Sequence, residues 1–441
     1  MISSINKVIH SQWVVPVEPP GVCLEKHCVA IDVQGRITAV LPSGDARIKF
    51  PQADHVELSS HVLLPGLINL HSHAAMTVLR GLADDLALMA WLNEHIWPAE
   101  QKHANAEMVY DGTLLACAEM LLGGVTSFND MYFFPDASVR AALSAGMRLT
   151  AGIIAIEFAN NYASGAADCL HKGLATRDTY NGEPLISFSL APHAPYSVSD
   201  TTFRRIVTMA EQLDLPIHIH LHETLDEIKQ SLTQFSLRPL ARLQNLGMLG
   251  PNFIAVHAVH LEQHEIDTLA KLGCHVAHCP ASNLKLASGI APIARLLDAG
   301  INIGIGTDGA VSNNKLDMFG EMRLAALLAK GASGRADVLP AHQALHMATL
   351  NAAMALGKQN EIGSLVAGKA ADMIAIDLST LQTAPCYDVI SHLVYAVSRE
   401  QATHVWVNGE LRVENGRLSK LDATELLAKA RYWQKKIQAK L

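Results

Sequence analysis

The chain has 441 residues, of which 49% are hydrophobic and only 17% are charged, so it can bury a large core and is not expected to be disordered. Its 34 basic and 42 acidic side chains give a formal net charge of −8. This balance argues against a nucleic-acid partner and against a polybasic membrane anchor. The sequence contains no uncharged apolar run of about 18 residues, so no membrane span is predicted.

The two ends of the chain share a pattern of short strands. Residues 22–42 alternate apolar and polar side chains around Gln34-Gly35, a hairpin-type turn. Residues 404–418 alternate in the same way around Asn408-Gly409, and residues 371–378 form a short apolar run. Both ends are therefore predicted to be rich in β-structure.

The last segment differs from these strands. Residues 423–441 have the spacing and charge of an amphipathic helix. We therefore expect residues 1–60 and 365–441 to assemble one small β-sandwich domain that includes a C-terminal helix.

Between residues 61 and 364 the pattern changes to short apolar runs followed by helical stretches. The runs occupy residues 62–73, 124–132, 185–195, 216–224, 253–261, 275–283 and 301–309. Strand–helix alternation over about 300 residues predicts an α/β fold, a closed (β/α)8 barrel of the TIM type. The runs end in His, Asn, Asp or Thr, and we expect these residues at the C-terminal mouth, where barrel enzymes keep their active sites.

Four side chains at the ends of these runs have the chemistry of a metal site. His71 and His73 lie two residues apart, so both imidazoles can point to one face of a strand. His220 and Asp308 end two later runs. Imidazole and carboxylate ligands suit Zn²⁺, with Fe²⁺ and Mn²⁺ as alternatives. Four ligands of this kind leave a position for water, so we predict one catalytic divalent ion.

The run at 216–224 offers three histidines on one strand face, His218, His220 and His222. Only a residue near the barrel mouth can reach the ion, and His220 stands three residues before Glu223. His218 would then lie one layer deeper as a core histidine, whereas spacing alone does not exclude His222. A glutamate after a strand is commonly a solvated acid at the start of a helix, which is the alternative role for Glu223.

These motifs resemble the amidohydrolase superfamily, and within it the aminohydrolases that act on 5′-methylthioadenosine and S-adenosylhomocysteine. The segments that carry the resemblance are HSH (71–73), HxxE (220–223), AVHAVH (255–260), HCPASNLKLASGIAP (278–292), GTDGAVSNN (306–314) and GSLVAGKAADMIAID (363–377). The resemblance runs almost end to end. It implies metal-dependent hydrolytic deamination of an adenine nucleoside at purine C6, which yields the inosine analogue and ammonia.

The resemblance also implies roles for single residues. The metal ligands would be His71, His73, His220 and Asp308. Glu223 would be the acid that protonates the purine ring nitrogen, and His257 would hold the attacking water. Asp308 would take the proton of that water. Superfamily members with two metals carry a lysine on the fourth strand, and residues 185–193 contain none, which favours a single ion.

Further residues are implied to contact the substrate. Glu100 matches a carboxylate that accepts hydrogen bonds from ribose hydroxyls, although without the resemblance it would be interpreted as a helix-surface acid. His193 matches a base-contacting histidine, with a plain strand-end residue as the alternative. Trp91 and Trp97 are candidate walls of the site. Arg148 is a further candidate, with a structural or surface charge as its other interpretation.

The segment after the third predicted barrel strand bears on the substrate. Some relatives bind the homocysteine carboxylate with arginines there, whereas residues 153–173 of this chain contain no arginine. This favours methylthioadenosine over S-adenosylhomocysteine, although His, Lys or water could replace a guanidinium.

Three rival functions remain at this point. Deaminases of guanine or another free base, and triazine aminohydrolases or dechlorinases, share the metal motifs, and Glu100 discriminates because a free base has no ribose. An inactive barrel that serves as a scaffold is the third rival. Such proteins lose ligands, whereas His71, Glu223 and the other motif residues are all present here.

Composition gives two weaker expectations. The seven cysteines are scattered and form no C-x-x-C pair, and the first 20 residues lack the pattern of a secretory signal. We therefore expect reduced thiols and a cytoplasmic location. The mean hydropathy of +0.17 is compatible with a homo-oligomer and equally with a thickly covered barrel.

Overall fold

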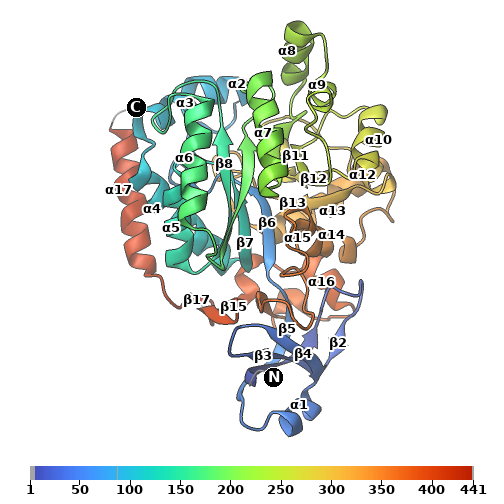
Figure 1. Cartoon of the computed structure of the whole chain (residues 1–441). Coiled ribbons are helices and arrows are strands. Elements are labelled where there is room, and N and C mark those ends of the chain that lie inside the picture. The colour runs from blue at the N-terminus through green and yellow to red at the C-terminus, as the bar shows by residue number, and fades with distance from the viewer. Residues whose placement is uncertain (1–4, 87, 440–441) are drawn as a thin grey trace.

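The computed structural model describes residues 5–86 and 88–439, which form a barrel above a smaller β domain (Figure 1). The barrel strands are β6 (Leu67–Ser72), β7 (Val125–Asp130), β8 (Arg148–Ala155), β9 (Ile186–Pro192), β10 (Ile217–Leu221), β11 (Phe253–His257), β12 (His275–His278) and β13 (Asn302–Ile305). Each pairs in parallel with its neighbour in the sequence, and β13 contacts β6. The predicted (β/α)8 barrel is confirmed.

The closure of the barrel brings together residues from its first and last strands. The amide of Asp308 donates to the carbonyl of His71 at 3.0 Å, and the amide of Thr307 donates to Oδ1 of Asn69 at 2.9 Å. A Cβ at Gly306 would lie 2.7 Å from the backbone nitrogen of His71, so only glycine permits this approach. Two side chains 237 positions apart in the chain thus reach the same place.

Helices cover the outside of the barrel. They are α4 (Ala106–Leu122), α5 (Pro135–Ala145), α6 (Ala166–Thr179), α7 (Asp200–Leu213), α8 (Leu225–Phe235), α9 (Pro239–Asn245), α10 (Gln263–Lys271), α11 (Pro280–Lys285), α12 (Ile293–Asp298), α13 (Met318–Ser333), α14 (Ala341–Met347) and α15 (Leu350–Ala355). Several begin at a side-chain cap, for example Thr224, which accepts from the amide of Glu227 at the start of α8. Among the described residues, every helix is too short or too polar to cross a membrane.

The connection between β6 and α4 is long and mostly helical. It contains η1 (Ala74–Leu79), α2 (Leu88–Trp91), the π-helical turn η2 (Leu92–Ile96) and α3 (Trp97–His103). Its apolar side chains pack with Tyr132 and with Trp433 of the C-terminal helix into a separate buried cluster. This β6–α4 connection is therefore anchored on its inner side while it covers part of the barrel mouth.

Segments from both ends of the chain form the β domain, as predicted. Its strands are β1 (Ile5–Val14), β2 (Leu24–Glu25), β3 (His27–Asp32), β4 (Ile37–Pro42), β5 (Asp54–Pro65), β14 (Met373–Asp377), β15 (Ala402–Val407), β16 (Glu410–Glu414) and β17 (Arg417–Leu418). Hydrogen bonds join them into one mixed sheet in the order β17-β16-β15-β14-β5-β1-β3-β4, with β2 beside β1. The terminal segments also contain the short helices α1 (Ser43–Lys49), η3 (Leu381–Thr383), α16 (Val389–Tyr395) and η4 (Arg399–Gln401), of which α16 packs on α13 and α14 of the barrel.

The two predicted hairpin turns meet in this domain. Gly35 and Gly409 both have a positive φ, 76° and 77°. A Cβ on Gly35 would lie 2.0 Å from the carbonyl oxygen of Asn408. The glycines therefore serve the turns and also the contact between the N-terminal and C-terminal halves of the sheet.

The C-terminal helix α17 (Ala423–Gln438) packs on the barrel, beside α4 (Figure 1). Nε1 of Trp433 donates to Asp111 of α4 at 2.9 Å, and Nζ of Lys429 donates to the same carboxylate at 2.7 Å.

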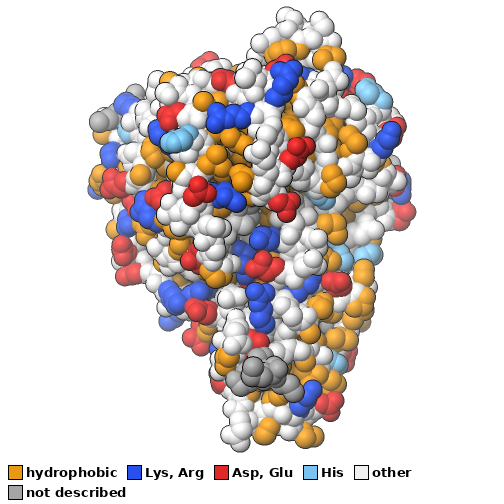
Figure 2. All heavy atoms as spheres, viewed as in Figure 1, with side chains coloured by type: hydrophobic (Ala, Val, Ile, Leu, Met, Phe, Trp, Pro, Cys, Tyr) orange, Lys and Arg blue, Asp and Glu red, His pale blue; other side chains and the backbone are white. Residues whose placement is uncertain are grey.

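The strand β5 continues to Pro65, past the expected domain boundary. On the face drawn in Figure 2, acidic and basic side chains are interspersed.

Candidate metal centre and substrate pocket

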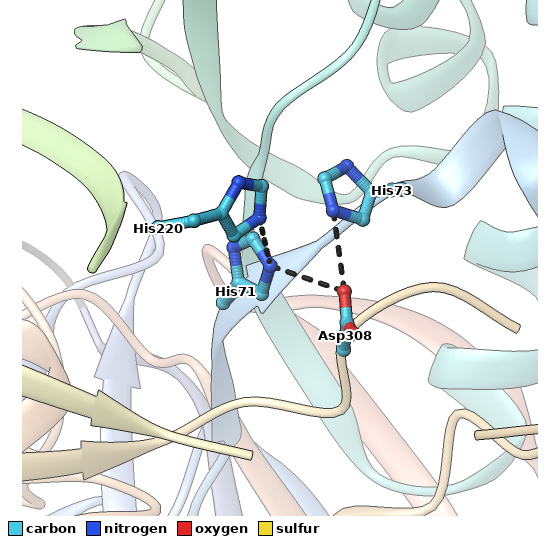
Figure 3. A group of neighbouring side chains, drawn as sticks. All are labelled: His71, His73, His220 and Asp308. Carbon is cyan, nitrogen blue, oxygen red and sulfur yellow. Dashed lines mark hydrogen bonds and ion pairs between the residues drawn. The ribbon is translucent and has the colours of Figure 1, made fainter. Parts of the chain in front are cut away.

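Four side chains converge at the C-terminal mouth of the barrel (Figure 3). His71 lies on β6, His73 just after it, His220 on β10 and Asp308 just after β13. One ligand atom from each lies within 4.8 Å of the others. Oδ1 of Asp308 is 3.1 Å from Nε2 of His71 and 3.2 Å from Nε2 of His73. The sequence prediction that these four residues come together is confirmed.

The outer nitrogens of the three histidines are already bonded. Nδ1 of His73 donates to the carbonyl of Met131 at 2.6 Å, and Nδ1 of His220 donates to the carbonyl of His193 at 2.8 Å. Nδ1 of His71 lies 2.8 Å from Nε2 of His218. A neutral imidazole that donates through Nδ1 presents a lone pair at Nε2, which is the form that binds metals.

This arrangement fits a divalent cation. Nε2 of His71 and Nε2 of His220 are only 3.2 Å apart, so in the neutral tautomers two lone pairs face each other beside a carboxylate. A cation between them turns this repulsion into coordination. The second carboxylate oxygen of Asp308 accepts from the hydroxyls of Ser282 at 2.6 Å and Ser312 at 2.7 Å, which fixes the orientation of the carboxylate. Three histidines and one aspartate suit a zinc-type ion with room for water.

The backbone at this mouth is strained at two of the predicted site residues. His257 has a φ of 70° and Asp308 a φ of 62°, in the left-handed region that residues other than glycine seldom occupy. Such conformations cluster at functional sites, where surrounding contacts hold them in place. No sequence motif predicted these positive φ angles.

Glu223 and His257 face each other beside the four converging side chains His71, His73, His220 and Asp308, called the metal group below. Oε2 of Glu223 lies 3.8 Å from Nε2 of His257. Burial raises the pKa of the Glu223 carboxyl above its ordinary value, which favours a group that can hold a proton. Nδ1 of His257 lies 2.8 Å from Oδ1 of Asn283, so the imidazole has a fixed orientation.

The sequence analysis missed the residue that holds Glu223 in place. The carboxylate of Glu227 accepts the amides of His222 at 3.0 Å and Glu223 at 2.9 Å. Burial raises the pKa of Glu227 to about 8. An acid four residues after Glu223, at the start of a helix, was the available signal, since such positions bind free backbone amides.

A cavity of about 260 Å³ opens from the metal group. Its lining includes the predicted residues Trp91, Trp97, Glu100, His193, Glu223 and His257. The side chain of Glu100 is buried and accepts a hydrogen bond of 2.6 Å from the hydroxyl of Tyr132. Burial raises the pKa of Glu100 to about 7. Tyr132, which also lines the cavity, was not identified from the sequence.

His193 lies beside His220 in the same cavity. Its Nδ1 is 2.9 Å from the hydroxyl of Ser197, which leaves Nε2 without a protein partner in the hydrogen bonds of the described residues. Burial lowers the pKa of His193 to about 3, with a further contribution from His73. A neutral imidazole can donate or accept a hydrogen bond at this position.

The remaining histidines of β10 have separate places. His218 lies next to His71, with its Nε2 2.8 Å from Nδ1 of His71. His222 points away from the metal group, since its Nδ1 lies 3.1 Å from the carbonyl of His260 and its Nε2 accepts the amide of Leu240 at 3.1 Å. The possibility that His222 is a ligand is therefore wrong.

Arg148 is placed away from the pocket. It begins β8, at the end of the strand opposite the mouth, and is not among the residues that line the cavity. Its guanidinium donates to both carboxylate oxygens of Asp372, at 2.9 and 3.1 Å, and to Glu361 at 2.8 Å. Its candidate role in substrate binding is thus wrong, and its alternative interpretation as a structural charge agrees with the geometry.

The family model of the amidohydrolase family matches residues 62–412. The chain belongs to the amidohydrolase family. This amidohydrolase is 47% identical over 432 residues to a protein of Saccharophagus degradans named 5-methylthioadenosine/S-adenosylhomocysteine deaminase, with 98% of this chain and 97% of that protein covered. It is 44% identical over 438 residues to a protein of the same name from Teredinibacter turnerae, with 99% of each covered.

Two solved structures extend the comparison. An adenosine deaminase from Xanthomonas campestris with bound zinc superposes with a TM-score of 0.97, at 45% identity and 99% coverage of both chains. An atrazine chlorohydrolase from Arthrobacter aurescens complexed with zinc superposes with a TM-score of 0.90, at 25% identity, with 97% of this amidohydrolase and 99% of that chain covered. The fold is thus shared with two zinc-bound proteins whose named substrates differ.

Proposed function

We propose that this amidohydrolase removes the 6-amino group of an adenine nucleoside by hydrolysis. The substrates would be 5′-methylthioadenosine, S-adenosylhomocysteine and, in addition, adenosine, and the products the inosine analogue and ammonia. The observation that carries this proposal is the buried carboxylate of Glu100 inside the cavity that opens from the metal group. Relatives that are 47% and 44% identical carry the corresponding name, and a neighbour that is 45% identical is named an adenosine deaminase.

We propose a single divalent ion, with zinc as the resident metal, held by His71, His73, His220 and Asp308. The donor set and the zinc in the neighbouring structures support this choice. When bound, the ion would lower the pKa of a water to about 7 and so supply hydroxide at neutral pH.

The chain's own residues would divide the proton transfers. Asp308 takes a proton from the attacking water, and His257 orients the water through a hydrogen bond. Glu223 delivers a proton to N1 of the purine while the oxygen adds to C6, so the ring can accept the electron pair. The bond between C6 and the amino nitrogen then breaks, and the amino group leaves as ammonia with the proton that Asp308 took from the water. The hydroxyl proton at C6 returns to Glu223 as the C6 carbonyl forms, so both carboxyl groups regain their starting states.

Glu100 and His193 would fix the position of the nucleoside. A carboxylate accepts hydrogen bonds from both hydroxyls of a ribose, and these bonds are stronger because the acceptor is charged. His193 would bond to the edge of the base. A deaminase of a free base, or a triazine hydrolase, would have no use for a buried acceptor at Glu100, which is why we favour the nucleoside.

Ammonia release from purified, zinc-loaded protein tests the proposal. We expect fast turnover of methylthioadenosine and adenosine, and weak turnover of guanine and of atrazine. Activity on guanine or on a triazine alone would leave the metal chemistry in place and overturn the nucleoside assignment.

We also place the enzyme in the cytoplasm, since all seven cysteines are unpaired.

A further inference from the structure

The orientation of the Asp308 carboxylate depends on two serines from different segments. Oδ2 of Asp308 accepts the hydroxyls of Ser282, in α11, and of Ser312, in the loop after β13. An oxygen of an ionised carboxylate offers about two lone-pair sites, so these hydroxyls occupy Oδ2. Oδ1 is left for the metal group, 3.1 Å from Nε2 of His71 and 3.2 Å from Nε2 of His73 (Figure 3). The positions of the serines therefore decide which oxygen faces the site.

A glutamate of helix α13 holds the residue next to each serine. Oε2 of Glu321 accepts the backbone amide of Ala281 at 3.2 Å, and Oε1 accepts from Nδ2 of Asn313 at 2.8 Å. Ala281 immediately precedes Ser282, and Asn313 immediately follows Ser312. One side chain thus ties together the two segments that carry the serines.

The same contacts reach the backbone of the site. Nδ2 of Asn313 also donates to the carbonyl of Thr307 at 2.7 Å, and Thr307 immediately precedes Asp308. The amide of Ala281 belongs to the first turn of α11, where backbone amides have no partner within the helix. Glu321 therefore satisfies a donor that the helix leaves free and holds the chain on both sides of the carboxylate.

Glu321 is buried, and the charged groups that act on it have its own sign. It is 3% exposed, and these charged groups are the carboxylates of Asp317 and Asp308. Burial raises the pKa of Glu321 to about 8. A buried acid without a cation costs free energy that an apolar side chain does not cost. The packing of α13 needs no acid here, since its buried neighbours Phe319 and Met322 are apolar. The hydrogen bonds of Glu321 are what sets it apart from them.

We infer that Glu321 is a positioning residue for the Asp308 carboxylate: it fixes Ser282 and Ser312, so that Oδ1 alone faces the metal ion and the attacking water. Glu321 is not among the residues that line the cavity, so it acts through the serines and not on the substrate. The inference rests on the proposed function, because it assumes that Asp308 is a ligand and takes the proton of the water.

Glu321→Leu removes both acceptors and keeps a side chain of similar size. We expect the visible absorption bands of the cobalt-substituted protein, recorded without substrate, to shift, because these bands report ligand geometry. The kcat for methylthioadenosine per metal-loaded molecule should fall by about tenfold or more, with KM unchanged within about twofold. Glu321→Gln keeps one acceptor in the same shape and should show a smaller loss. Unchanged bands or an unchanged kcat in the folded variants would overturn the inference.

Met322→Ala is the matched control for a general loosening of the helix. Met322 is the next residue of α13 and is fully buried, but it takes no part in these hydrogen bonds. This variant should lower the stability of the fold and leave both the cobalt bands and the kcat per folded, metal-loaded molecule unchanged. A band shift equal to that of Glu321→Leu would show that any disturbance of α13 has the same effect and would overturn the inference.

A cycle of variants tests whether Glu321 acts through the serines. In the variant Ser282→Ala/Ser312→Ala, Glu321 has no hydroxyl left to position. Adding Glu321→Leu should then shift the cobalt bands no further and lower kcat by less than about twofold. A full further loss would show another route and overturn the inference. Turnover of guanine but of no adenine nucleoside by the parent would overturn the proposed function, whereas the cobalt bands, which need no substrate, would still decide the role of Glu321.

Discussion

Nδ1 of His71 lies 2.8 Å from Nε2 of His218, and both rings are buried inside the barrel. Burial lowers the pKa of His218 well below its ordinary value, so this ring is neutral and can accept a hydrogen bond at Nε2. For Nε2 of His71 to offer its lone pair to a metal ion, Nδ1 of His71 must carry the proton and donate to Nε2 of His218. A residue on β10 thus fixes the tautomer of a proposed ligand on β6.

We predict that His218→Leu weakens zinc binding by about 10- to 100-fold, the usual effect of losing a partner behind a ligand. His218→Gln keeps an acceptor for Nδ1 of His71 and should retain most of the affinity. Competition with a chelator measures both variants against the parent protein. Equal affinity in the leucine variant would show that His71 needs no fixed tautomer.

Glu223→Gln tests the proposed proton transfer. The amide keeps the size of the side chain beside His257, 3.8 Å away in the parent protein, but cannot carry the proton to the purine. We predict that kcat falls by about 10²- to 10⁴-fold. The zinc content should stay the same, because Glu223 is not one of the four converging ligands. Turnover at the parent rate, measured as ammonia release, would remove Glu223 from the reaction.

Glu100→Gln distinguishes a nucleoside from a free base. A hydrogen bond to a charged acceptor is worth about 1.5–3 kcal/mol, so we predict that kcat/KM for methylthioadenosine falls by about 10- to 100-fold. Turnover of free adenine, which has no ribose, should hardly change. Tyr132→Phe removes only the 2.6 Å bond to Glu100 and should have a smaller effect. An equal loss on both substrates would indicate that Glu100 acts on the base or on the fold.

The metal group and the barrel were predictable because their signals are local. His71 and His73 are two positions apart on a strand, and His220 and Asp308 end apolar runs, so parallel pairing places all four at one end of the barrel. The support of these residues was not predictable from one sequence. Asn283 behind His257, for example, depends on the close approach of segments 26 residues apart.

The pH dependence of stability has an expected contribution from Glu227. Burial raises the pKa of this carboxyl to about 8 in the folded protein, above its value in the unfolded chain. Between these two values the folded state keeps a proton that the unfolded state releases, so stability falls as the pH rises through this window. Glu227→Gln exchanges no proton. We predict that the Tm of the variant minus that of the parent increases from pH 5 to pH 9, and a constant difference would contradict the assignment.

Arg148 couples the barrel to the β domain, and its removal should affect stability without affecting the chemistry. The guanidinium is buried against Asp372 and Glu361, so Arg148→Met leaves a buried carboxylate without its partner. We predict a loss of about 3–5 kcal/mol in the free energy of unfolding, measured with denaturant. The double variant Arg148→Met/Asp372→Asn removes both charges and should recover part of this loss. The kcat per folded, zinc-loaded molecule should equal that of the parent, because Arg148 lies outside the lining of the substrate cavity. A reduced kcat in the correctly folded, zinc-loaded variant would instead show that Arg148 contributes to the reaction.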